Sequence, residues 1–165
     1  MVKALADYKE YMGRLENILQ QSAAGRGQVG PLVTGVENGC QVSPQDASAQ
    51  IRTVIDNRTS VLNQLAGLSV APNSEAQNIY SLLQQSLQSS VNADTQYKAW
   101  MDYLYTSYYY TFPIGCPNGV PPKNDSFNTA RADDGNSTNL KTQFVTAFNP
   151  VATRLGLPTS DPSSF

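Results

Sequence analysis

The fold is decided by residues 74–108, which read SEAQNIYSLLQQSLQSSVNADTQYKAWMDYLYTSY. Within them, one stripe of residues recurs every three or four positions, which is the period of a helix. The stripe consists of Tyr80, Leu83, Leu87, Ser90, Asp94, Tyr97, Met101, Leu104 and Tyr108. Apolar neighbours widen it to the breadth of a face that is buried in a helical core. These residues predict one long helix, started by Ser74, at the centre of an all-α fold.

Two more helices are predicted on the N-terminal side of this segment. A heptad stripe covers residues 4–38, with a kink or break near Pro31, because proline interrupts helical hydrogen bonding. After it, Ser43-Pro44 is typical of an N-cap followed by proline in the first turn. The second helix starts there and ends near Gly67.

The C-terminal third begins with a loop. Residues 112–135 are rich in proline and predict a long crossing, and a short helical turn around residues 126–133 is left open. A fourth helix is capped by Ser137 or Thr138 and broken or kinked at Pro150, and residues 157–165 form a flexible tail. No segment shows the alternation of apolar and polar residues that is typical of a strand. We therefore predict an up-down-up-down four-helix bundle with a kinked first helix.

The two cysteines are predicted to form a disulfide. Cys40 and Cys116 both lie in turn-like sequence, whereas buried thiols are expected on apolar helix faces. In an up-down-up-down path they follow the first and third helices, which finish at the same end of the bundle. Because the third helix is long, we expect the kinked segment 27–38 to climb beside its end. The alternative is two unrelated free thiols.

Composition excludes several classes of function. The chain has 165 residues, which fits one domain, placed here at residues 1–156. The formal net charge is −2 with neither sign concentrated, so the sequence lacks the basic stripe that nucleic acids require. Histidine is absent, which excludes any mechanism with an imidazole base or ligand. No stretch approaches the roughly 18 apolar residues of a membrane span.

The compartment is predicted from the cysteines rather than from the N-terminus. Charged residues follow directly after Leu5, so the N-terminus lacks the apolar core of a secretory signal. This leaves a cytoplasmic protein or the mature segment of an exported one. Because disulfides form in oxidising compartments, we expect an extracytoplasmic protein, secreted or at the cell surface, with the cytoplasm as the alternative.

Three charged residues interrupt the helical stripes, namely Arg26, Arg58 and Asp94. A charge on a buried stripe is costly unless it is paired. With the second connection centred near residue 71, Arg58 faces Gln84 and misses Asp94 by about 15 Å, so Arg26 is the predicted partner of Asp94. The three residues predict a buried polar layer that fixes helix register. The alternatives are a positively charged interior that recognises an anionic ligand, and positions exposed to solvent.

An aromatic run surrounds the end of the long helix. It comprises Trp100, Tyr103, Tyr105, Tyr108, Tyr109, Tyr110 and Phe112. On a helix these side chains point all around the axis, so they cannot all enter one core. Because tyrosine is enriched at binding surfaces, the run is a candidate patch for a ligand or partner. The alternative is a helix end wrapped by the proline-rich loop that follows.

Two further motifs match known sites only in part. Residues 25–30 fit the GxGxxG pattern of nucleotide-binding loops, but a helix precedes them and Pro31 follows, so we expect a kinked helix. Residues 133–136 resemble a calcium loop only in composition, and we expect a solvated turn. The sequence thus predicts no cofactor and no metal. With no convincing second acid to face Asp94, it also predicts no enzyme.

Pieces along nearly the whole chain resemble one family, the uncharacterised extracytoplasmic helical domains of actinobacteria, which often follow a single membrane span. The pieces are residues 21–26, Gly39-Cys40, Asn57-Arg58, residues 61–65, Ser90, residues 93–97, Trp100, Cys116-Pro117 and residues 144–150. The resemblance implies an exported, disulfide-bearing, all-helical module, and it implies no activity.

Together these features predict a non-enzymatic, extracytoplasmic helical module that binds a ligand or partner, as the sensor-like part of a secreted or membrane-anchored protein. The partner is a protein or a small molecule whose identity the sequence does not name. The alternative is a structural module that self-assembles into homo-oligomers through its Tyr-rich end. A carboxylate-based hydrolase comes third, and requires Asp94 in an open cleft near a second acid.

Overall fold

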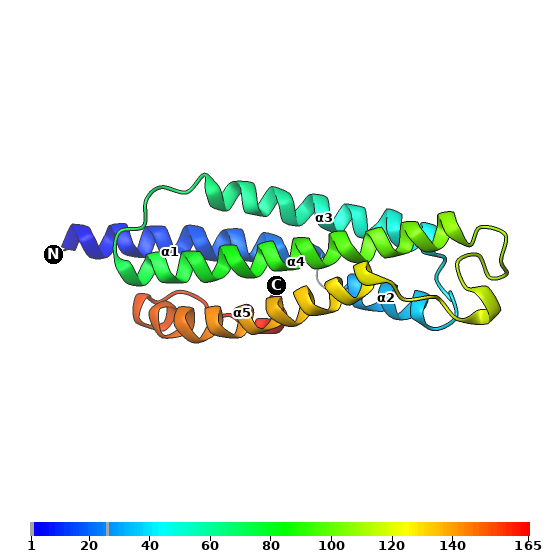
Figure 1. The fold of residues 1–165 in the computed structure, drawn as a ribbon. Helices are drawn as coiled ribbons and strands as arrows, with labels where there is room; N and C mark the ends of the chain where they lie inside the picture. Colours follow the sequence, from blue (N-terminus) through cyan, green and yellow to red (C-terminus); the bar gives the residue numbers. More distant parts are fainter. Residues whose placement is uncertain (1, 26) are drawn as a thin grey trace.

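The structure is a computed structural model that describes residues 2–25 and 27–165 (Figure 1). The α-helices are α1 (Val2–Ser22), α2 (Val29–Glu37), α3 (Pro44–Ala66), α4 (Ser74–Ser107) and α5 (Asp125–Leu155). Short 3-10 turns lie at Ala23–Gly25, Pro117–Gly119 and Pro162–Ser164. The described residues contain no strand, so the predicted all-α class is confirmed.

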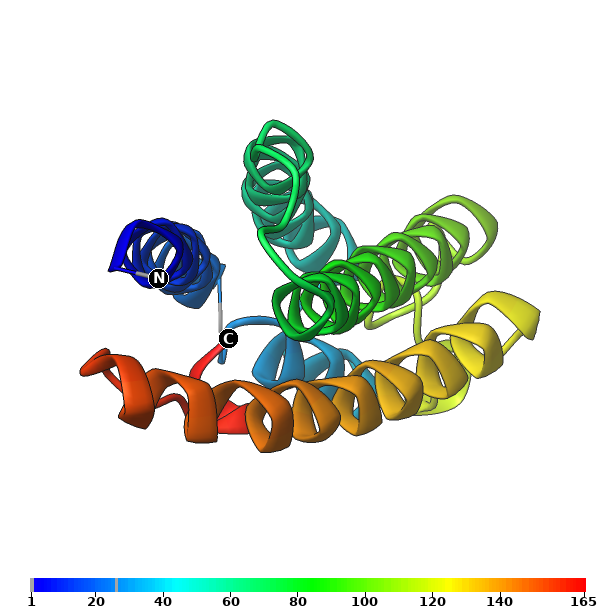
Figure 2. The ribbon, with the colours of Figure 1, turned by 90° about the vertical axis from the view of Figure 1, so that its left-hand side faces the viewer.

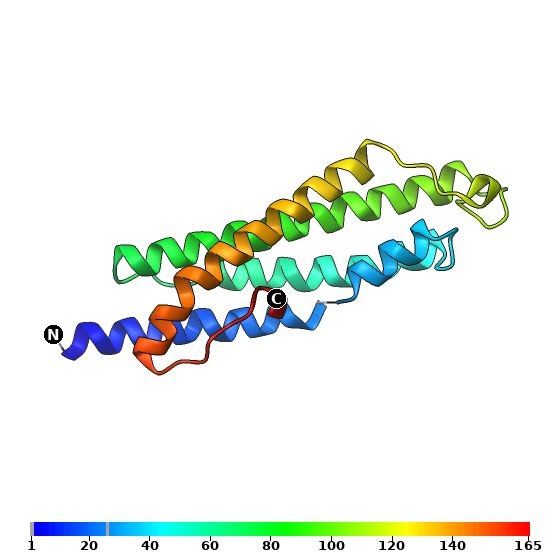
Figure 3. The same cartoon turned by 90° about the horizontal axis from the view of Figure 1, so that it is seen from below.

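Helices α1 and α2 stand where one kinked helix was predicted. The chain runs in the same direction through both, but α2 is displaced from the axis of α1 (Figure 3). The break lies before α2 rather than at Pro31, which occupies the first turn of that helix. Proline is tolerated there because the first N–H groups of a helix have no intrahelical partner.

The predicted second and third helices are present as α3 and α4. The side chain of Ser43 accepts a hydrogen bond from the backbone N–H of Asp46 and caps α3. Asn73, rather than Ser74, caps α4 by accepting from the backbone N–H of Ala76. At 34 residues, α4 spans most of the bundle, and the other helices are arranged around it (Figures 1 and 2).

Helix α5 begins earlier than predicted. Its cap is Asn124, whose side chain accepts from the backbone N–H of Phe127, so Ser137 lies inside the helix and the crossing is shorter. Pro150 also lies inside α5 and does not break it, since the residues around it are held in the core. These buried residues are Phe148, Val151, Ala152 and Leu155.

The core consists of two hydrophobic clusters. The first includes Met12, Leu15, Val61, Leu65, Leu83, Leu87, Phe144 and Phe148. The second includes Leu32, Val36, Ile51, Trp100, Met101, Leu104 and Phe127. Helices α3, α4 and α5 contribute to both, while α1 belongs to the first and α2 to the second. Helices α3, α4 and α5 therefore each cross a middle layer that belongs to neither cluster.

The predicted disulfide joins Cys40, which follows α2, to Cys116 in the loop after α4. Their Cα atoms are 6.0 Å apart. Leu32 and Val36 of α2 belong to the same cluster as Leu104 near the end of α4. Residues 27–38 therefore run beside the C-terminal end of α4, as predicted, and this brings the two cysteines to the same end of the bundle.

Residues 157–165, predicted as a flexible tail, fold back along α5 (Figure 3). Phe165 is only 3% exposed, and its ring packs edge-on against Phe144. The side chain of Asn149 exchanges two hydrogen bonds with the backbone of Ser160. Burial of one aromatic ring thus orders a segment whose composition is typical of a frayed end.

Loss of the disulfide is expected to lower the free energy of unfolding by about 4 kcal/mol, because the bond spans 76 positions of the unfolded chain. Urea unfolding with and without reductant measures this difference. The Cys40→Ala/Cys116→Ala variant is the control, and its stability should equal that of the reduced protein in both buffers. Equal stability of the natural sequence with and without reductant would contradict the prediction.

Candidate functional site

The middle layer of the bundle is polar. Its buried side chains are Ser22, Arg58, Ser86, Ser89, Ser90, Asp94 and Ser137. The hydroxyls of Ser90 and Ser137 are hydrogen-bonded to each other at 2.6 Å, and Ser137 also donates to the carbonyl oxygen of Ser86. These contacts join α4 to α5, because the small serine side chains let the two backbones approach closely.

Arg58 on α3 and Asp94 on α4 form an ion pair in this layer, with Nη1 donating to Oδ2. The register predicted from the sequence, which separated these two residues, is therefore wrong. Arg26, the predicted partner of Asp94, lies outside the described residues. A buried carboxylate and a buried guanidinium thus compensate each other, as low-dielectric surroundings require.

The connection between α3 and α4 explains the error in register. Residues 67–73 are not a tight turn, and α4 begins well beyond the end of α3 (Figure 1). A second contact, from the hydroxyl of Ser48 to the carboxylate of Asp102, agrees with the pairing of Arg58 and Asp94. The midpoint of each pair lies about five residues later in the sequence than residue 71, the centre assumed for the connection. A shift of about five residues in this centre moves the residue opposite Arg58 by about ten positions along α4.

Burial dominates the electrostatics of Asp94. Loss of hydration raises the pKa of its carboxyl to about 6, from an ordinary value of 3.8. Attraction by Arg58, and more weakly by Lys141, lowers the pKa and offsets part of this rise, while the nearby charge of Asp134 adds to it. Asp94 is therefore a carboxyl that changes charge close to neutral pH.

A cleft of about 490 Å³ opens onto this ion pair. Arg58, Ser90, Asp94 and Tyr97 from α3 and α4 are among the residues that line it. A second side comes from the break between α1 and α2 and from the start of α2, and consists of Gly27, Val29, Gly30, Val33 and Thr34. Gly27, Val29 and Gly30 of the GxGxxG segment thus border a cleft, but they follow a helix rather than the strand that a nucleotide-binding loop requires.

Helix α5 supplies a third side that sequence reasoning missed. Arg131, Asp134, Thr138 and Lys141 line the cleft from one face of this helix. Arg131 engages the hydroxyl of Tyr97, and Lys141 donates to the main-chain oxygen of Phe165 at 2.5 Å. Their helical spacing was visible in the sequence, but it falls across the predicted start of the last helix and so was not recognised.

The aromatic run is divided by the structure. Trp100 is fully buried, and its Nε1 donates to the carbonyl oxygen of Pro122, so it belongs to the core and not to a surface patch. Tyr108 is half-buried against the second cluster. Tyr110 and Phe112 are 98% and 95% exposed. The remaining members, Tyr103, Tyr105 and Tyr109, contact neighbouring tyrosines edge-on.

Comparison with known proteins does not assign this chain to a family. No family model, curated protein or solved structure matches this chain. The resemblance to actinobacterial extracytoplasmic domains stays a prediction. Among residues 2–25 and 27–165, no helix is long and apolar enough to cross a membrane. In the same residues, no three acidic or cysteine side chains are grouped so that they could hold a metal ion.

The raised pKa of Asp94 predicts a specific pH dependence. Because the folded protein holds this proton more tightly than the unfolded chain, the free energy of unfolding should fall as pH rises from about 4 to about 6, by up to about 3 kcal/mol. Urea unfolding at several pH values should show this fall in the natural sequence and not in Asp94→Asn. Carboxyl carbon NMR gives the titration midpoint directly, and a midpoint below pH 4 would contradict the prediction.

Proposed function

We propose that this protein is a non-enzymatic, extracytoplasmic binding module that holds a small molecule in the cleft above the Arg58–Asp94 ion pair. The observation that carries the proposal is the opening of a cleft onto a buried pair of charges. Its volume of about 490 Å³ lies within the usual range of small-molecule sites.

A purely structural ion pair accounts less well for this arrangement. Taking two charges out of water is costly, and a pair that only fixes register gains from being sealed by apolar side chains. Here the side chain of Arg58 is still 10% exposed, and polar groups from α5 continue the same surface outward. A cleft that is already formed and is lined by both apolar and polar side chains is a common form of ligand site.

The disulfide supports the proposed compartment. Disulfides form in oxidising surroundings and are rare in the cytosol. Together with the resemblance noted in the sequence, the Cys40–Cys116 bond favours an exported protein, secreted or held at the cell surface, in which this bundle is the sensor-like part.

A carboxylate-based hydrolase is favoured by one observation. Asp134 lines the cleft together with Asp94 and is the second acid that the sequence did not reveal. We rank binding above hydrolysis, because the Asp94 carboxylate is engaged by Arg58, and this ion pair must break before Asp94 can transfer a proton to a substrate.

A different observation favours self-assembly through the Tyr-rich end. Tyr109, Tyr110 and Phe112 expose large apolar surfaces at the end of the bundle that carries the disulfide. Surfaces of this kind mark interaction sites. Assembly of copies through this end depends on protein concentration, whereas binding in the cleft does not, so the two proposals are separable.

Binding in the cleft is tested by NMR with a library of small anionic, neutral and cationic organic molecules. At least one molecule should shift the backbone amide signals of residues that line the cleft, without being consumed. Gly30→Trp should abolish the shifts, because Gly30 borders the cleft and has open space for a side chain.

Gly135→Trp is the matched control. Gly135 is also helical and also has open space around it, but it does not line the cleft, so binding should be kept. Shifts confined to other parts of the surface, or binding that survives Gly30→Trp, would contradict the proposed site. If the protein hydrolyses the bound molecule, the proposal of a binding module is wrong and the carboxylate-based hydrolase takes its place.

A further inference from the structure

We infer that the end of the bundle that carries the disulfide binds the surface of a lipid membrane, with residues 109–120, the loop tip, entering the headgroup region. The loop tip follows α4 and forms one extreme end of the molecule (Figure 1). This inference is independent of the cleft and of any ligand bound there. It is argued from the exposure of the loop tip, from its lack of charge and from the hydrogen bonds of its backbone.

Exposed apolar side chains concentrate at this end. Among the described residues, six of the nine large apolar side chains that are exposed belong to residues 103–120, namely Tyr103, Tyr109, Tyr110, Phe112, Ile114 and Val120. Because Tyr110 and Phe112 are exposed almost completely, no neighbour screens them, and they project from the surface. A contiguous apolar patch of this kind marks an interaction site.

The projection of these side chains favours a medium that surrounds them. A stable interface between two proteins needs about 20–30 residues on each side. Two copies that meet tip to tip cover only the part of each projecting side chain that faces the other copy. The headgroup region of a bilayer is fluid and closes around the whole loop tip. Tyrosine is enriched in this region, because its ring is apolar and its hydroxyl can stay in contact with water.

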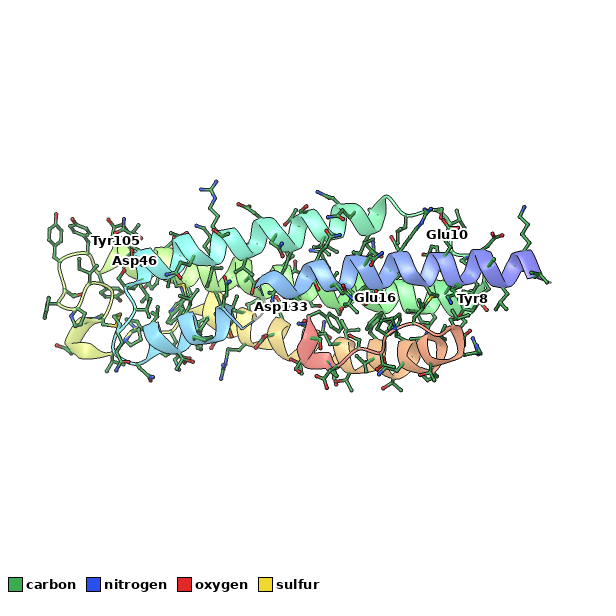
Figure 4. All side chains as sticks on the ribbon, turned by 180° about the vertical axis from the view of Figure 1, so that it is seen from behind. Tyr8, Glu10, Glu16, Asp46, Tyr105 and Asp133 are labelled. Carbon is green, nitrogen blue, oxygen red and sulfur yellow. A yellow bond between two sulfur atoms is a disulfide. The ribbon has the colours of Figure 1, made fainter. Side chains whose placement is uncertain are left out.

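The same end of the bundle carries no charge. Residues 103–122 contain no acidic or basic side chain, and neither do residues 38–45, which the disulfide joins to them. Since a charged side chain is costly to move into lipid, an uncharged loop enters more easily. Asp46 follows the second segment and marks this end in Figure 4. An end with no cation and a flanking carboxylate fits zwitterionic lipid better than anionic lipid.

Most backbone N–H groups of the loop do not need water. Unpaired N–H groups oppose entry into lipid, because no water is there to accept from them. Within residues 111–122, four positions are prolines, which have no N–H group. Five others donate to carbonyl oxygens of residues 108–117, namely Thr111, Gly115, Cys116, Gly119 and Val120. These turns and the disulfide also fix the shape of the loop, so little conformational freedom is lost on binding.

The test is flotation of the full chain with vesicles of pure phosphatidylcholine, where a lipid titration gives the partition coefficient. The natural sequence should float with the vesicles. Tyr110→Asp and Phe112→Asp should each lower the partition coefficient by at least about tenfold, because each removes apolar surface and adds a charge. Since both side chains project into solvent, both variants are expected to fold.

Val70→Asp is the matched control. Val70 is 92% exposed and lies in the connection between α3 and α4, at the opposite end of the bundle (Figure 1). This variant replaces a projecting apolar side chain with the same charge, and it should leave the partition coefficient unchanged. A loss equal to that of Phe112→Asp would overturn the assignment to the loop tip.

Lipid composition and NMR supply two further readouts. Addition of phosphatidylglycerol should not strengthen binding, and added salt should not weaken it, because the loop tip has no cation. In phosphatidylcholine bicelles with a nitroxide on the headgroup, the amide signals of residues 109–120 should broaden. Those of residues 68–72 should keep their intensity.

The remaining outcomes overturn the inference and leave the proposed function untouched. The first is a natural sequence that does not float with phosphatidylcholine. The second is binding that requires phosphatidylglycerol and is lost in salt, since cations outside the loop tip would then hold the protein. The third is a dimer that forms with rising protein concentration, is lost in Phe112→Asp and does not float, since the loop tip would then bind a second copy of this chain.

Discussion

The ion pair between Arg58 and Asp94 is the constraint on which the rest of the molecule depends. Two charges in the interior must face each other, since either one alone would be buried without compensation. This requirement fixes the register of α3 against α4. It also divides the apolar core, because the serine-lined layer around the pair separates the two hydrophobic clusters. The cleft opens at this layer, where α1 has ended and α2 begins on a different axis.

Each end of the bundle is held by its own contacts. At one end, Tyr8 and Arg154 both donate to the Glu75 carboxylate, each at 2.6 Å, so α1, α4 and α5 are joined. At the other end, the disulfide joins the segment after α2 to the loop after α4. Tyr8 and Tyr105 mark these opposite ends in Figure 4. With both ends secured, the middle layer can carry a polar cleft instead of a sealed core, and under the proposed function a ligand would reach the buried charges through this cleft.

The sequence predicted where the helices lie along the chain better than how they pair and in which register. The stripe along residues 74–108 identified α4 because one face of that helix is buried along most of its length. The start of α5 was missed, since only Phe127 and Ala130 are buried in its first three turns. Arg58 and Asp94 stood out as charges on buried stripes, yet their pairing depended on the path of residues 67–73, which periodicity does not determine. The α5 side of the cleft was lost together with the start of that helix.

A double-mutant cycle on the ion pair tests the central claim most directly. Arg58→Met and Asp94→Leu each leave one buried charge without its partner, so each should lower the free energy of unfolding by about 3–5 kcal/mol. The double variant removes both charges and should recover much of this loss, which gives a coupling energy of at least about 2 kcal/mol. The exposed pair of Glu10 and Arg14 is the control, with an expected coupling of about 0.5 kcal/mol or less. Losses at Arg58 and Asp94 that simply add would contradict the account, because the two charges would then not be paired in the folded protein.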